Sequence, residues 1–112
     1  MNKGEATRKR MPLRLPSRVR VGEKAYSIDI VETMLRKGEN GRIYYDEGVI
    51  RLARRSNTCG RKYCKAEMTE TFWHEMVHAI LYDMKHPLCS NEDFVSRFAR
   101  RLSMAIKSAR FK

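Results

Sequence analysis

The sequence predicts an α+β fold in which a small antiparallel sheet of two hairpins precedes two helices. Three observations support this prediction. Apolar and polar residues alternate at 18–21 and 26–31, as they do in half-buried strands, and short apolar runs flank a turn signal at 43–45 and 49–52. Residues 66–84 contain no proline or glycine and are rich in large apolar side chains. A second apolar stripe with helical spacing lies between residues 90 and 110.

The length of 112 residues predicts one folded domain, over residues 18–112. Residues 1–17 are expected to form a flexible basic arm, because Pro12 and Pro16 interrupt regular structure there.

No apolar run approaches the roughly 20 residues that cross a bilayer. The N-terminus has no apolar signal core, and the number of cysteines is three, an odd number. We therefore expect a cytoplasmic protein of a bacterial or phage-infected cell, with no membrane partner.

Two hairpins account for the first half of the predicted domain. Strands at 18–21 and 26–31 flank a turn at Gly22, and strands at 43–45 and 49–52 flank a turn at Gly48, which is free to adopt a positive φ. Between the hairpins, residues 32–37 are expected to form a helical turn that Gly38 ends. Residues 54–65 form a basic loop.

Two helices account for the second half. The helix at 66–84 is apolar on more than one side, which predicts burial, and His86-Pro87 ends it. Ser90 is expected to cap the next helix, which runs to about residue 110, with Asp93 completing a capping box. The apolar stripe of that helix should pack on the first helix.

The apolar helix carries the motif H-E-x-x-H, at His74, Glu75 and His78. Residues four apart lie one above the other on a helix, so both imidazoles can point at one metal ion. Zinc accepts neutral histidine nitrogen as a ligand, and the intervening glutamate is positioned to take a proton from metal-bound water. The motif predicts a zinc site with Glu75 as the general base.

A catalytic zinc site commonly has three protein ligands and one water. The third ligand must come from beyond the helix, and the candidates are His86, Cys89, Glu92 and Asp93. If Ser90 is the cap, Asp93 is engaged at the cap and Glu92 is free to face the two histidines. A carboxylate on the packed side of the helix would also need a cation nearby.

The order of these segments resembles small phage and bacterial metallopeptidase-like proteins of the ImmA/IrrE-type gluzincin group, which are minimal zincins. The resemblance extends over roughly residues 18–106 and is sharpest in TFWHEMVHAIL and NEDFVSRFARRL. It implies a zinc-dependent peptidase acting on a protein or peptide substrate. It also implies that His74, His78 and Glu92 are the ligands and that Glu75 is the base.

Two other interpretations compete. SprT-like proteases, which act on DNA-bound proteins, also carry HEM-x-HA and are basic; the resemblance to them implies a histidine as third ligand, here His86. The net charge of +11 is concentrated in 1–24, 51–65 and 94–112, which would suit a non-catalytic, zinc-stabilised module that binds nucleic acid or protein.

The remaining reactive side chains have simpler interpretations. Cys59 and Cys64 could hold a second metal ion with Cys89, but free or buried thiols fit their loose spacing better. Four tyrosines could stabilise an oxyanion, but packing is the simpler interpretation for Tyr44, Tyr45, Tyr63 and Tyr82.

Overall fold

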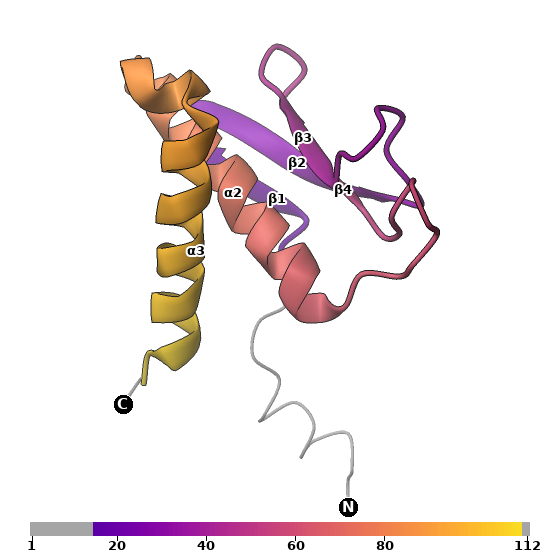
Figure 1. Ribbon diagram of the computed structural model, residues 1–112. Helices are drawn as coiled ribbons and strands as arrows, with labels where there is room; N and C mark the ends of the chain where they lie inside the picture. The colour runs from indigo at the N-terminus through magenta and orange to yellow at the C-terminus, as the bar shows by residue number, and fades with distance from the viewer. Residues whose placement is uncertain (1–14, 111–112) are drawn as a thin grey trace, which may run out of the picture.

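The computed structural model describes residues 15–110, so most of the predicted arm at 1–17 lies outside the described residues. The fold is α+β, as predicted: a four-stranded sheet is followed by two helices with a short 3-10 helix between them (Figure 1). None of the helices in this range has the length and apolar character to cross a membrane. The elements are β1 (Arg18–Val21), β2 (Lys24–Val31), β3 (Gly41–Tyr44), β4 (Val49–Ala53), α2 (Lys65–Asp83), η1 (Pro87–Ser90) and α3 (Glu92–Ser108).

Both predicted hairpins form, but the sheet that joins them is mixed rather than wholly antiparallel. The strand order is β1-β2-β4-β3. Strand β2 pairs in parallel with β4, from Ser27 opposite Val49 to Val31 opposite Ala53. Alternation of apolar residues shows which face of a strand is buried, but it does not show which strand edges meet. For this reason the parallel pairing was not predicted.

The turns of the hairpins use glycine where the backbone requires it. Gly22 has φ +63° and Gly48 has φ +69°, a region that other residues rarely adopt. The prediction for Gly48 is therefore confirmed.

The helical turn predicted at 32–37 is wrong. Asn57 donates from Nδ2 to the carbonyls of Met34 (2.7 Å) and Arg36 (2.8 Å), and its Oδ1 accepts from the Gly38 N–H (2.9 Å). These bonds engage carbonyls that a helix would pair within itself, and they hold the segment as an irregular loop.

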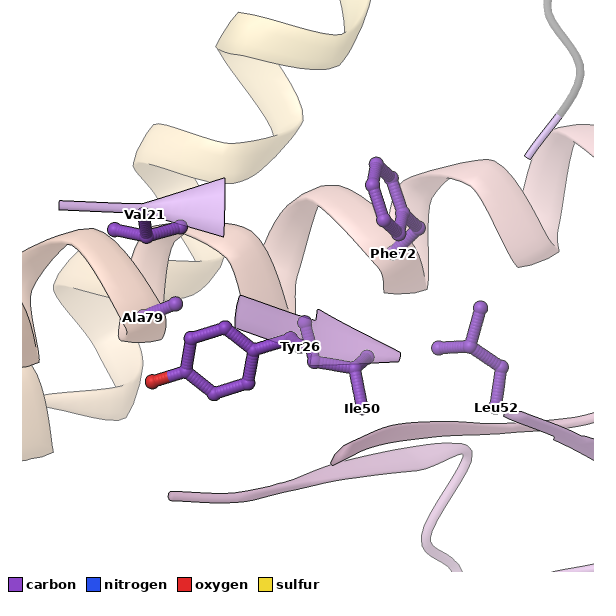
Figure 2. Close-up of a cluster of buried hydrophobic side chains, with 6 residues drawn as sticks. All are labelled: Val21, Tyr26, Ile50, Leu52, Phe72 and Ala79. Carbon is purple, nitrogen blue, oxygen red and sulfur yellow. The ribbon is translucent and has the colours of Figure 1, made fainter. Parts of the chain in front are cut away.

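Helix α2 forms the middle layer of the molecule. It packs on one face of the sheet, while α3 packs on α2 and η1 rather than on any strand of the described chain (Figure 1). The core between sheet and helix is drawn in Figure 2 and comprises Val21, Tyr26, Ile50, Leu52, Phe72 and Ala79. A second cluster between α2 and α3 comprises Val77, Leu81, Val95 and Ala99. Trp73 borders both clusters and so joins the three layers.

The end of α2 determines how the chain turns toward α3. The His86 N–H bonds to the Leu81 carbonyl (2.9 Å) and the Lys85 N–H to the Tyr82 carbonyl (3.0 Å). This is the Schellman arrangement, and it places Lys85 in the left-handed region at φ +56°. The chain therefore leaves the helix sharply and can return along it.

The start of α3 differs from the prediction by one residue. Ser90 belongs to η1, which begins at Pro87, and Asn91 is the cap: its Oδ1 accepts from the Phe94 N–H at 3.0 Å. Proline favours the first position of a helical turn, and the 3-10 turn it begins takes in Ser90. As a result Glu92 occupies the first helical position of α3 instead of the second.

Candidate metal centre

Two histidines on α2 face a cleft at the junction of the two helices and the second hairpin. His74 and His78 lie one turn apart, and their ring centroids are 5.0 Å from each other. The exposed fraction of the side chain is 23% for His74 and 10% for His78. The spacing and burial therefore hold both imidazoles in place while leaving their Nε2 atoms accessible from the cleft.

Glu92 reaches both histidines from the first position of α3. Its Oε1 lies 3.0 Å from Nε2 of His74, and its Oε2 lies 3.0 Å from Nε2 of His78. A carboxylate is also favoured at a helix N-terminus, where the helix dipole is positive. Three potential ligand atoms, one from each side chain, thus lie within 4.8 Å of one another.

The main chain of η1 fixes the orientation of His78. Its Nδ1 lies 2.8 Å from the carbonyl oxygen of Cys89, and because a carbonyl can only accept, Nδ1 carries a proton and donates it. In the neutral imidazole the free lone pair is then on Nε2. Hydrogen bonds of this kind commonly set the tautomer of metal-binding histidines.

The resulting arrangement suits a cation. The lone pair of neutral His78 at Nε2 faces a carboxylate oxygen of Glu92 at 3.0 Å, and two acceptors at this distance repel unless a proton or a metal ion lies between them. A tetrahedral ion with bonds of about 2.0–2.1 Å holds its ligand atoms about 3.3 Å apart, which is close to the observed separation. Burial also lowers the pKa of His74 against the opposing effect of Glu92, which favours the neutral, metal-binding form. The donor set of two imidazoles and one carboxylate therefore fits a metal ion.

Glu75 is buried beside this group. Its exposure is only 6%, and it lines the same cleft as His74 and His78. Burial, followed by the nearby carboxylates of Glu92 and Glu39, raises the pKa of Glu75 to about 8, against the opposing effect of Arg42. A positive ion at the cluster would stabilise the Glu75 carboxylate and lower this pKa.

The cleft has a volume of about 820 Å³ and lies between α2, β3 and the start of α3. One wall is formed by β3, through Gly41, Arg42 and Ile43. Within residues 15–110, β3 pairs only with β4, so its other edge has unused backbone hydrogen-bonding groups.

Tyr45 forms another part of the wall. Its ring stacks on Tyr82 at a centroid distance of 3.9 Å, and its hydroxyl lies 3.5 Å from Sγ of Cys89. Burial, followed by the hydrogen bond to Cys89, raises the pKa of Tyr45, so it remains a neutral phenol. This neutral phenol lines the cleft beside Cys89.

The other candidate ligands lie elsewhere. His86 caps η1, where its Nδ1 accepts from the Leu88 N–H at 3.1 Å. Asp93 faces Arg97, with 3.6 Å between Oδ2 and the guanidinium. Cys59 and Cys64 are exposed free thiols, and no second group of three close ligands occurs in the described part of the chain.

Sequence reasoning missed two components of the site. The Cys89 carbonyl is a backbone group, which leaves no signal in the amino-acid sequence. Tyr45 is positioned by stacking on Tyr82, which lies on α2, far along the chain. Nothing in the sequence around Tyr45 distinguishes it from the other tyrosines.

Comparisons with protein-family models, with curated proteins and with solved structures gave no match. The function is therefore inferred from the chemistry of the site.

Proposed function

We propose that the protein is a zinc-dependent peptidase of the minimal gluzincin type, with a protein or peptide as its substrate. The observation that carries the proposal is the convergence of His74, His78 and Glu92 from two helices on one point. Two histidines and one glutamate form a known ligand set of catalytic zinc, and HExxH supplies a glutamate for proton transfer.

The openness of the site favours catalysis over a purely structural metal. A closed structural zinc site has four protein ligands. In residues 15–110 three side chains converge, and the Glu92 side chain is 68% exposed. A structural zinc in a binding module, or a SprT-like site that uses His86, fits this arrangement less well, because His86 is engaged in the cap of η1.

Zinc bound here would polarise a peptide carbonyl and lower the pKa of a bound water. Side chains and the backbone would supply proton transfer, oxyanion stabilisation and substrate alignment. Glu75 would accept a proton from the attacking water and return it to the leaving amine. Tyr45 would donate its hydroxyl to a developing oxyanion, and the free edge of β3 would align an extended peptide by strand addition. We place this activity in the cytoplasm of a bacterial or phage-infected cell, in keeping with the exposed free thiols.

The proposal is tested by measuring hydrolysis with and without zinc. The protein is stripped with a chelator, dialysed, and incubated with a mixed peptide library whose products are identified by mass spectrometry. We expect cleavage only after zinc is restored, and Glu75→Gln should abolish it while still binding zinc, because the change removes the proton acceptor and retains the ligands.

Glu70→Gln is the matched control. Glu70 lies on the same helix and lines the same cleft, but it pairs with Arg100 at 3.3 Å rather than with the histidines. This variant should retain cleavage. Equal rates for Glu75→Gln and the wild type would remove Glu75 from the mechanism, and zinc binding without cleavage of any peptide would favour the structural role.

A further inference from the structure

The face of the sheet turned away from the helices carries four arginines. On β1, Val19 and Val21 contact the core, so the alternate residues Arg18 and Arg20 point to the opposite face. The strand register brings two more to that face, since Arg42 on β3 lies directly opposite Arg51 on β4. We call this surface the open face.

No helix covers the open face within the range that the structure describes. Both helices lie on the other side of the sheet, where α2 contacts the strands and α3 contacts α2 (Figure 1). Arg18 and Arg20 are exposed, and the side chains of Arg42 and Arg51 are 35% and 38% exposed. The arginines are therefore available to a partner.

The positive charge of the open face is only partly compensated. Arg51 pairs with Asp29 at 3.2 Å, and Arg42 pairs with Glu39. Among the described residues, no carboxylate lies within ion-pairing distance of Arg18 or Arg20. Like charges directly opposite on neighbouring strands also repel, as at Arg42 and Arg51. A polyanion would relieve this repulsion.

The open face also has a flat stacking surface beside a hollow. The guanidinium of Arg51 lies over the ring of Tyr44, 4.9 Å from its centroid. This pair lines a hollow of about 420 Å³, together with Leu35 and Arg36 of the preceding loop. Unpaired nucleic-acid bases stack on aromatic rings and on the planes of arginine guanidinium groups.

We propose that the open face binds single-stranded nucleic acid. Phosphates of one strand contact Arg18, Arg20 and Arg42 across a width of about 14 Å, three strand spacings, and a base stacks at Arg51 and Tyr44. An acidic peptide would match the charges but would not use the stacking surface. Arg42, on the edge strand β3, also borders the histidine cleft. The rest of the open face lies on the other side of the sheet from the histidine cluster, and this proposal does not depend on the proposed peptidase activity.

The test is fluorescence anisotropy of a labelled single-stranded DNA oligonucleotide, titrated with the full chain at several salt concentrations. The variant replaces Arg18, Arg20 and Arg51 by glutamine. Affinity for a single strand falls with salt by a logarithmic slope of about −0.7 per phosphate contact, so the loss of the two phosphate contacts at Arg18 and Arg20 should reduce that slope by about 1.4. The loss of Arg51 removes the stacking surface as well. We expect affinity at low salt to fall more than tenfold.

A matched control removes the same charge from the exposed side of α3, which faces away from the sheet. It replaces Arg97, Arg101 and Lys107 by glutamine, all of them exposed. This variant should lose less than threefold in affinity. Equal losses in the two variants would overturn the proposal, because they would show that only the overall charge matters.

Two measurements on the unaltered protein remain decisive if a variant does not fold. Amide NMR shifts on addition of the oligonucleotide should map to β1, β4 and β3; shifts confined to α3 or to loop 54–65 would refute the open face as the binding site. Polyglutamate should compete weakly, and competition equal to that of the oligonucleotide would show that the partner is an acidic peptide instead.

Discussion

Removal of Glu92 is the sharpest test of the candidate metal centre, and His86 provides its control. Glu92 contacts both histidines at 3.0 Å, whereas His86 accepts one backbone hydrogen bond from Leu88 at 3.1 Å. Without metal, the two alanine variants should lose similar stability. Glu92→Ala loses a favourable charge at a helix N-terminus, worth about 0.3–1 kcal/mol, and His86→Ala loses a cap hydrogen bond of about 1 kcal/mol.

With metal, the two variants should differ strongly. Zinc at 100 times its dissociation constant stabilises the folded state by about 2.7 kcal/mol. For a chain of this size that corresponds to a rise in Tm of about 10 °C. If loss of Glu92 weakens binding 100-fold, the same zinc concentration provides only about 0.4 kcal/mol, or roughly 2 °C. His86→Ala should retain nearly the full rise.

The assay is thermal unfolding followed by circular dichroism, in a chelator and then at a fixed concentration of free zinc. The quantity compared is the zinc-dependent rise in Tm, so differences in metal-free stability cancel. If His86→Ala abolishes the rise and Glu92→Ala keeps it, the assignment of Glu92 is wrong. If the wild type itself shows no rise, there is no zinc site.

Three further predictions concern the fold. Lys85→Gly should raise the free energy of unfolding by about 1 kcal/mol, measured by urea denaturation, because glycine adopts φ +56° without the cost that other residues incur; a loss of stability would contradict the Schellman end of α2. Leu52→Ala should cost about 2–5 kcal/mol because Leu52 is fully buried, while Leu35→Ala, at a fully exposed position, should change stability by less than about 0.5 kcal/mol in the same experiment. The Arg61 guanidinium holds the pKa of Glu67 at about 2, below its ordinary value of 4.5. This pair therefore stabilises the fold above pH 4.5, and the effect is lost as the pH falls toward 2. Arg61→Gln should raise the pKa of Glu67 in an NMR titration, and an unchanged pKa would show that the pair does not form in solution.

Much of the fold could be predicted because its signals are local. Alternation identified the first two strands and short apolar runs the second two, and the two hairpins followed from turns at Gly22 and Gly48. The apolar stretch identified α2 to within one residue at each end. The parallel pairing of β2 with β4 could not be predicted in the same way, since it depends on which hairpin edges meet after the core has formed.

The candidate site was only partly accessible from the sequence. Helical spacing places His74 and His78 on one side of α2 whatever the rest of the chain does. The position of Glu92 in α3 depends on which residue caps the helix. The sequence does not decide this, because Ser90 and Asn91 are both good capping residues. The choice between them depends on the 3-10 turn that Pro87 begins. The contact of the Cys89 carbonyl with His78 depends on the same turn.

Because α3 does not contact the sheet in the described part of the chain, the candidate metal ligands would also affect how firmly α3 is held to the rest of the fold. Within residues 15–110, α3 contacts α2 and η1 but no strand, so an ion held by His74, His78 and Glu92 would link α3 to α2 across that interface. By thermodynamic linkage, whatever loosens α3 must weaken metal binding by the same free energy, and removal of the ion must loosen α3. Amide hydrogen exchange would then rise in α3 before it rises in the sheet, so metal content would govern the opening of α3.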